Sequence, residues 1–275
     1  MKNLRLVLSV AFATLAFLLA YAQIFKGWVA DLISDPNYGH GLVLGGLLIA
    51  LAIWRSLKGD ESGERGLAPI WWGWALMALL AAVGGLLVAN DSLLRWSLIL
   101  AVLAAVESLA PAKIVSAWRG PLLALLLLVP WPYVLYYGAT AHLQRMSSAA
   151  AAFVLHWSGV PLAREGNLLH FAGYDLEVVE ACSGLRSLLV MSALAAFIAA
   201  AARLSVRRTL FLLLLSVPLA LGANLLRLVL TGYGAQLGGP ETAENLFHLG
   251  GGLLSFALGV IVLGMAAFIR RGTRS

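Results

Sequence analysis

The sequence predicts an all-α membrane protein, a polytopic bundle of about eight transmembrane helices with a small extracytoplasmic amphipathic helix and β-element before its only cysteine, Cys182. Hydrophobic residues make up 61% of the 275 residues and charged residues only 12%, whereas soluble domains carry about 25% charged residues. Mean hydropathy is +0.90. The net charge is +6, but the basic residues form no compact run, which argues against a nucleic-acid partner. We expect residues 1–275 to form one integral membrane domain.

Apolar runs predict the spanning helices, because a segment in hydrocarbon must satisfy its own backbone polar groups. Each run is near the ~20 residues that a helix needs to cross a bilayer. The first run resembles a signal peptide, but it is long and lacks a convincing small-x-small cleavage site, so we interpret it as a retained span. The predicted spans are 5–23, 41–55, 70–89, 95–111, 118–137, 184–202, 208–228 and 249–269.

Charge placement predicts the orientation of these spans. If the N-terminus is cytoplasmic, 13 of the 19 Lys and Arg residues fall on the cytoplasmic side, and 9 of the 13 acidic residues fall outside. That bias follows the positive-inside rule. We therefore predict a multi-pass protein of the cell (inner or cytoplasmic) membrane, with both termini in the cytoplasm.

The segment 138–180 is the one long stretch between predicted spans, and it falls outside. Its first part, ATAHLQRMSSAAAAFVLHWSG, has apolar residues at helical spacing and predicts an amphipathic helix along the membrane surface. Its second part, VPLAREGNLLHFAGYDLEVVE, has short alternating runs separated by Gly166-Asn167 and Ala172-Gly173. This pattern is typical of a β-hairpin or a small β-element.

Three residues combine a chemistry with a shared position at the outer face. Cys182 begins the sixth predicted span, Arg227 ends the seventh, and His248 begins the eighth. Arg227 is ~30 Å along its helix from the cytoplasmic arginines. A helix N-terminus favours a thiolate, a histidine can protonate a leaving amine, and an arginine can stabilise an oxyanion. Each also has a structural interpretation: Cys182 as a small apolar filler, Arg227 as a side chain that reaches the interface, and His248 as a helix cap.

Other polar residues carry weaker hypotheses. His142 and His156 are typical of solvated interfacial histidines, whereas His40 at the start of the second span has structural and functional interpretations of similar weight. We expect Glu107, near a cytoplasmic helix end, to be hydrogen-bonded or to reach the interface. One cysteine excludes an internal disulfide framework and a multi-cysteine metal site, and we expect neither metal nor cofactor.

Several segments, in order along residues 25–260, resemble the exosortase/archaeosortase family of multi-pass cysteine transpeptidases. These segments are YGHG (38–41), VPWP (129–132), LQR (143–145), GVPLAREGN (159–167), EACSGLR (180–186), Asn224-Leu225-Leu226-Arg227 and His248 followed by glycines. The resemblance implies that Cys182, Arg227 and His248 form a catalytic triad. Gly39 stands where the family often has serine, which leaves the role of His40 open.

The resemblance further implies the substrate and the reaction. Substrates would be exported proteins whose C-terminal sorting signal has a short motif, a membrane span and a basic cluster. The enzyme would cut at the motif on the outer face through a thioester acyl-enzyme and transfer the product to an envelope acceptor. Alternatives are hydrolysis with water as the sole acceptor, and a permease or transporter, for which the nearly uniformly apolar spans offer little support.

Residues around the triad have supporting hypotheses. Arg186, four residues after Cys182, either orients the substrate motif or forms an ion pair with Glu180 or Glu177. Ser183 and Gly184 leave the backbone around the thiol open to a substrate. Asn224 belongs to the segment around Arg227 that resembles the family, and we expect it to support the site. We also expect membrane lipid to surround the bundle.

Overall fold

The computed structural model describes the backbone of residues 2–35, 37–58, 70–172, 174–178, 183–249 and 255–269. It describes their side chains except those of 2–14, 174, 240, 244–249, 255, 256 and 269. Its contacts divide the chain into two compact units, Met1–Pro132 and Tyr133–Ser275. The expectation of a single domain over 1–275 stays a prediction.

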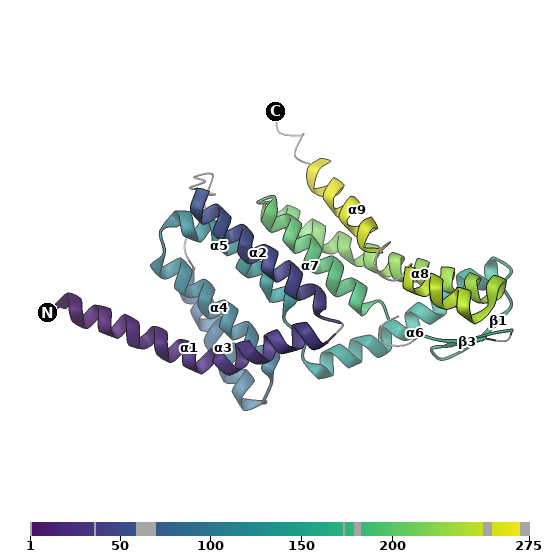
Figure 1. Ribbon diagram of the computed structural model, residues 1–275, viewed down its shortest axis with the longest axis horizontal. Helices are drawn as coiled ribbons and strands as arrows, with labels where there is room; N and C mark the ends of the chain where they lie inside the picture. The colour runs from purple at the N-terminus through teal and green to yellow at the C-terminus, as the bar shows by residue number, and fades with distance from the viewer. Residues whose placement is uncertain are drawn as a thin grey trace. The chain divides into compact units, whose positions relative to one another are not determined.

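Every regular element described in the first unit is a helix. Helix α3 packs along α4, α2 packs on α5, and α1 contacts both α2 and α4. The core between them is apolar and includes the fully buried Leu48, Ala52 and Leu103. Figure 1 labels the helices α1 (Lys2–Ser34), α2 (Gly39–Lys58), α3 (Trp71–Leu87), α4 (Asp91–Leu109) and α5 (Ala112–Leu125). The 3-10 helix η1 (Leu126–Leu128) follows α5 directly.

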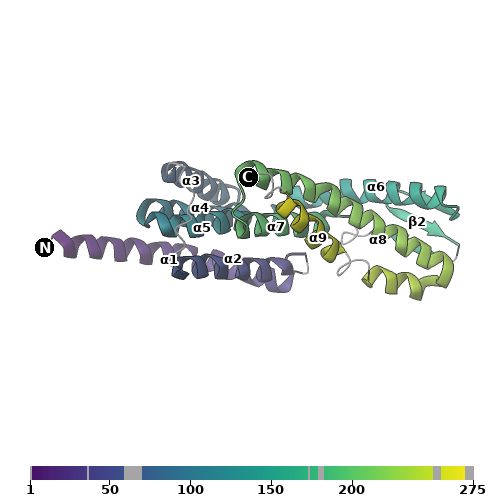
Figure 2. The ribbon, with the colours of Figure 1, turned by 90° about the horizontal axis from the view of Figure 1, so that it is seen from above.

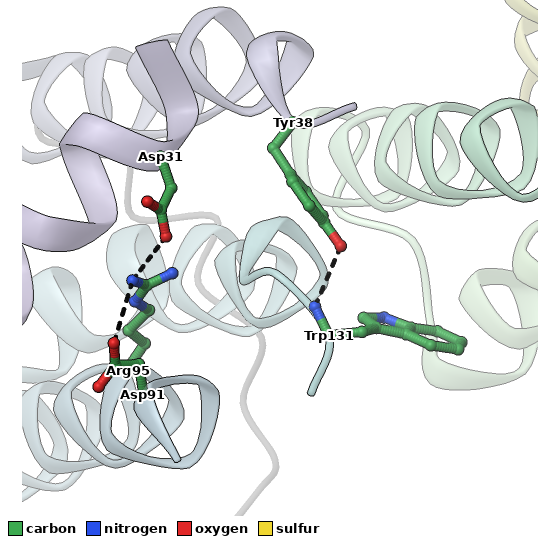
Figure 3. A network of polar contacts seen from close by, with 5 residues as sticks. All are labelled: Asp31, Tyr38, Asp91, Arg95 and Trp131. Carbon is green, nitrogen blue, oxygen red and sulfur yellow. Dashed lines mark hydrogen bonds and ion pairs between the residues drawn. The ribbon is translucent and has the colours of Figure 1, made fainter. Parts of the chain in front are cut away.

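An ion-pair cluster joins α1 to the start of α4. Arg95 is 4% exposed, and its Nη2 lies 2.7 Å from Asp31 Oδ2 and 3.9 Å from Asp91 Oδ2 (Figure 3). Nearby in the unit, the Trp131 backbone N–H donates to the Tyr38 hydroxyl over 3.3 Å. A buried guanidinium needs such partners, because an isolated charge is costly to remove from water.

Glu107 is hydrogen-bonded, which confirms one of the two expectations for it. Its Oε1 accepts from Arg119 Nε at 2.7 Å, and its Oε2 accepts from the Ile70 N–H at 3.1 Å. The carboxylate is fully buried, whereas the Arg119 side chain is 21% exposed. The pair ties α4 to α5 and to the residue before α3.

The predicted continuous span 118–137 is wrong. Helix α5 ends at Leu125, η1 ends at Leu128, and a new helix begins only at Tyr133. Pro130 and Pro132 explain the interruption, because proline has no backbone N–H and disfavours helical backbone in the residue before it. The apolar composition of this run concealed the break.

In its described residues, the second unit combines four helices with a small sheet. Helices α6 and α8 pack side by side, and α7 and α9 pack on α8 (Figure 1, Figure 2). Contacts of Ser147 with Asn224 and of Leu155 with Gly232 show that α6 and α8 run parallel. The helices are α6 (Tyr133–Trp157), α7 (Leu185–Ala201), α8 (Val206–Leu249) and α9 (Ser255–Ile269).

The predicted β-element is confirmed, with three strands. Strands β1 (Leu162–Glu165), β2 (Leu168–Phe171) and β3 (Tyr174–Glu177) form an antiparallel sheet in the order β1-β2-β3. The register pairs Leu162 with Phe171, and Leu169 with Leu176. Leu169, Phe171 and Leu176 are buried, as expected when alternate side chains share one face of a strand.

The observed course of α8 shows that two predicted helix ends, at Arg227 and at His248, are wrong. It continues well past Arg227, which the sequence placed at the end of a span, and it runs to Leu249 with a non-helical break at Gly239. His248 is therefore in the last turn of α8 and does not begin the next helix, which starts at Ser255. The end of the apolar run marks the predicted membrane boundary, whereas the helix itself continues beyond it.

Among the described residues, four helices are long and apolar enough to cross a membrane: Leu15–Ser34, Gly39–Lys58, Asp91–Leu109 and Val206–Gly239. The pair Ala112–Leu128 and Tyr133–Trp157 makes a fifth if it is one broken span, and three shorter apolar helices accompany them. This supports an all-α membrane protein. The number eight, and the lie of α6 along the membrane surface, stay predictions.

The second unit has two apolar cores along α8. One core, around Met191, Leu212 and Leu263, joins α7, α8 and α9. The other, around Leu155, Leu169 and Leu228, joins α6, the sheet and the later part of α8. The stretch of α8 between Ala220 and Leu228 connects the two cores.

Candidate functional site

A buried polar layer occupies α8 between its two apolar cores. Asn224 is 1% exposed and Arg227 is 6% exposed. The two residues are three apart, so they lie on one face of the helix. Their side chains are joined directly, because Arg227 Nη2 donates to Asn224 Oδ1 at 2.5 Å.

A chain of hydrogen bonds continues from this pair to the segment before α7. Asn224 Nδ2 donates to Ser147 Oγ on α6 at 3.1 Å. The Ser147 hydroxyl then donates to the Ser183 carbonyl oxygen, also at 3.1 Å. Arg227 is thereby connected through two side chains to the residue that follows Cys182 in the chain.

Ser183 and Gly184 form the entry to α7. The fully buried Ser183 accepts the Leu185 N–H with its Oγ at 3.2 Å, which satisfies one of the free donors at a helix start. Gly184 has φ = +88°, and a Cβ there would lie 3.2 Å from Asn224 Nδ2. Glycine therefore allows both the backbone conformation and the close approach of Asn224.

The cysteine segment, residues 179–182, is preceded by a residue that is also held by hydrogen bonds. Val178, which follows β3, is fully buried. Its N–H donates to the Asn167 carbonyl at 2.9 Å, and its carbonyl accepts from Asn167 Nδ2 at 3.3 Å. Residues 179–182 thus run between two anchored residues, Val178 and Ser183.

The turn that holds Val178 is itself attached to α6. The buried Ser148 donates to the Gly166 carbonyl at 3.0 Å, and Arg164 Nη1 donates to the same carbonyl at 2.7 Å. Ser147 and Ser148 are consecutive, so neighbouring residues of α6 support the two ends of the cysteine segment.

The structure brings together three of the residues predicted for the site: Ser183, Asn224 and Arg227. Cys182 and Glu180 lie outside the described residues. His248 is in the described backbone of α8, but its side chain lies outside the description. The catalytic roles of Cys182, Arg227 and His248 therefore stay predictions.

The remaining predicted residues fall elsewhere. His40 is half-buried in the first turn of α2, in the first unit, and Arg186 is half-buried in the first turn of α7. Among the residues that the structure describes, no ion pair joins Arg186 to the exposed Glu177. This leaves Glu180 and the orienting role as the open hypotheses for Arg186.

The sequence analysis did not identify Ser147, Ser148 or Asn167 as site residues. One usable signal was the pair of hydroxyls in an otherwise alanine-rich stretch of α6, since a buried hydroxyl needs a hydrogen-bond partner. Within the described side chains, no group of three His, Cys, Asp or Glu residues could hold a metal ion. The expectation of a site without metal or cofactor stays a prediction.

A comparison with known families shows which family the chain belongs to. The family model described as transmembrane exosortase (Exosortase_EpsH) matches residues 28–265. That range includes every residue of the polar layer and both residues that anchor the cysteine segment. No curated protein and no solved structure matches the chain. Because the family match covers most of the sequence, the chain belongs to the transmembrane exosortase family.

Proposed function

We propose that this protein is a membrane-embedded cysteine transpeptidase that cleaves the C-terminal sorting signals of exported proteins at the outer membrane face. Membership of the transmembrane exosortase family supports this class of activity. The substrates would carry a short motif, a membrane span and a basic cluster. Cleavage would leave an acyl group that passes to an acceptor in the envelope.

The observation that carries the proposal is the hydrogen-bond chain that joins the buried Arg227, through Asn224 and the half-buried Ser147, to the buried Ser183. A guanidinium that is 6% exposed is expensive to bury. Its connection to the residue after the only cysteine is expected if Arg227 and the thiol act on one substrate. A purely structural arginine at the membrane edge would instead reach toward water.

The proposed reaction has two steps. The Cys182 thiolate attacks the scissile carbonyl, and Arg227 stabilises the oxyanion of the tetrahedral intermediate. The carbon–nitrogen bond then breaks as His248 protonates the departing amine, which leaves a thioester on Cys182. An envelope amine, or water, then attacks the thioester and gives its proton to His248, and the carbon–sulfur bond breaks to regenerate the Cys182 thiolate.

The course of α8 is compatible with a role for His248. The helix carries Arg227 twelve residues before Gly239 and His248 nine residues after it, which corresponds to ~18 Å and ~14 Å of helix. Both views show the second arm running back beside the first (Figure 1, Figure 2), and Ala243 shares a core with Leu228 and Ala235. The second arm thus returns toward the part of α8 that carries Arg227, as the proposed role of His248 requires.

Co-expression with candidate substrates tests the proposal. Suitable substrates are exported proteins of the same genome that end in a motif, a span and a basic cluster. We expect Cys182→Ala to abolish cleavage while the protein remains inserted, and Ser158→Ala to cleave normally, because the Ser158 hydroxyl makes a local bond to the Leu155 carbonyl. Cleavage of every candidate substrate by Cys182→Ala at the wild-type rate would exclude the proposed nucleophile.

Mass spectrometry of the mature substrate separates transfer from hydrolysis. Transfer to an envelope acceptor adds mass to the new C-terminus, whereas hydrolysis leaves a free carboxylate. We expect added mass. A free carboxylate in intact cells would reassign the protein as a peptidase that uses the same residues.

A further inference from the structure

We propose that Ser147 is a positioning residue of the active site, holding Ser183, the residue that follows Cys182, toward Arg227. This inference rests on the function proposed above and adds a residue that makes no contact with the reacting atoms. Ser147 lies on α6, while Arg227 and Asn224 lie on α8 and Ser183 precedes α7. It is therefore the point where three separate elements meet through hydrogen bonds.

The hydroxyl of Ser147 acts both as a hydrogen-bond acceptor and as a hydrogen-bond donor. It accepts from Asn224 Nδ2 and donates to the Ser183 carbonyl, each over 3.1 Å. With the bond from Arg227 to Asn224, all donors in the chain point the same way, from the guanidinium toward the backbone after Cys182. Aligned hydrogen bonds in a low-dielectric interior polarise one another, so each link strengthens the next.

The surroundings leave few substitutes for this contact. Asn224 and Ser183 are buried, so water cannot readily replace a lost partner. The backbone of Ser183 is also constrained on its other side, because Ser183 Oγ accepts from Leu185 and Gly184 packs on the Asn224 amide. Loss of the Ser147 hydroxyl would remove the hydrogen bonds that join Asn224 on α8 to the Ser183 carbonyl at the entry to α7.

Alkylation of Cys182 by iodoacetamide measures the alignment without requiring a substrate. Cys182 is the only cysteine, so the label reports one site. At pH 7 we expect Ser147→Ala to slow alkylation about 10-fold, because the thiolate is the reactive form and a nearby guanidinium favours it, and this stabilisation weakens when Ser183 is no longer held toward Arg227. At pH 10 the rates should converge, because a thiol there is ionised in most surroundings.

Whether alkylation becomes slower or faster distinguishes a positioning role from a loss of packing that merely exposes the thiol. A merely structural role would expose the thiol when Ser147 is lost, and alkylation would become faster. Faster or unchanged alkylation at pH 7 in a folded Ser147→Ala protein would overturn the proposal. Ser158→Ala, whose lost bond is local, is the matched control and should react at the wild-type rate.

A second pair of variants keeps the test decisive if Ser147→Ala does not fold. Thr and Val have the same shape, but only Thr retains the hydroxyl. We expect Ser147→Thr to react and cleave close to the wild-type rate and Ser147→Val to resemble the alanine variant. Equal rates for the two variants would overturn the role of the hydroxyl.

A double-mutant cycle then assigns the effect to the hydrogen-bond chain. Asn224→Asp retains an acceptor for Arg227 but removes the donor to Ser147. If both residues act through one chain, the combined variant should be no slower than the slower single variant. Multiplicative effects would contradict this, and so would normal thiol reactivity in either single variant. Cleavage by Cys182→Ala would instead contradict the proposed function itself.

Discussion

Gly184 is the residue whose replacement most directly disturbs the polar layer. Its φ of +88° is in the left-handed region, which costs a residue with a side chain about 1–2 kcal/mol, and a Cβ would crowd Asn224 Nδ2. We expect Gly184→Ala to lower the free energy of unfolding in detergent by at least about 1 kcal/mol. Thermal or denaturant unfolding measures this.

Gly222, on the same helix as Asn224, is the matched control for that substitution. It is exposed, and a Cβ there meets no atom within 4 Å. Alanine is the better helix former by up to ~1 kcal/mol, so Gly222→Ala should be neutral or stabilising. Equal stability of the two alanine variants would refute the argument for Gly184.

Glu107 carries a second prediction at the residue scale. Its carboxylate is fully buried against Arg119 and the Ile70 N–H, so Glu107→Gln leaves a largely buried guanidinium without its counter-charge. Such a loss costs about 3 kcal/mol. Denaturant unfolding should show this loss, while Asp91→Asn should cost under ~1 kcal/mol, because the Asp91 carboxylate is 76% exposed and 3.9 Å from Arg95. Similar losses in both variants would contradict the assignment.

At the scale of the element, the break in α8 determines where its second arm goes. Gly239 has φ = 73° and ψ = −167°, a conformation that is essentially restricted to glycine. Gly239→Ala should therefore lower the unfolding free energy by about 1–3 kcal/mol and slow cleavage about 10-fold by redirecting the arm that carries His248. Unfolding and cleavage assays measure the two effects.

Gly264 in α9 is the control for Gly239. A Cβ at Gly264 meets no atom within 4 Å, and the helix around it is regular. Gly264→Ala should leave both stability and cleavage near wild type. A Gly239→Ala protein with wild-type stability and cleavage would show that the break is not needed.

The small sheet shows why some elements follow from local sequence and others do not. Its strands could be predicted because Gly166-Asn167 separates alternating runs, and Gly166 does adopt φ = +61°. The ends of α8 and the interruption before Tyr133 were predicted wrongly. Hydropathy reports where a chain meets lipid, whereas backbone conformation at Pro130, Pro132 and Gly239 decides where a helix stops.

At the scale of the whole molecule, the positive-inside rule predicts which side each segment faces. In a Cys182→Ser background, we expect Glu165→Cys to react with a membrane-impermeant maleimide in intact cells. Arg207→Cys should react only after permeabilisation. Both positions are exposed, so access depends on the side of the membrane. The opposite labelling pattern would reverse the predicted topology.

The same reagent tests the predicted side of the active site. Cys182 in the otherwise unaltered protein should react from outside the cell. A thiol that stays unreactive even in the folded, detergent-solubilised protein would instead support its interpretation as buried filler. This result is independent of any substrate and of the acceptor.

The sequence by itself determined the membrane class, the β-element, the family resemblance and three residues of the hydrogen-bond chain, Ser183, Asn224 and Arg227. Composition, turn residues and short ordered motifs are local properties, and each can be seen without knowing which segments meet. The family match over residues 28–265 confirms that resemblance. Catalytic roles for Cys182, Arg227 and His248 remain to be tested.

Only the tertiary structure decided that Ser147 stands between Arg227 and the segment after Cys182. Ser147 is 36 residues from Ser183 and 77 from Asn224 along the chain. Nothing in the local sequence records that α6 and α8 run parallel with these residues in contact. Packing of the two helices on a shared core brings the hydroxyl, the amide and the carbonyl together, and burial then makes their hydrogen bonds necessary.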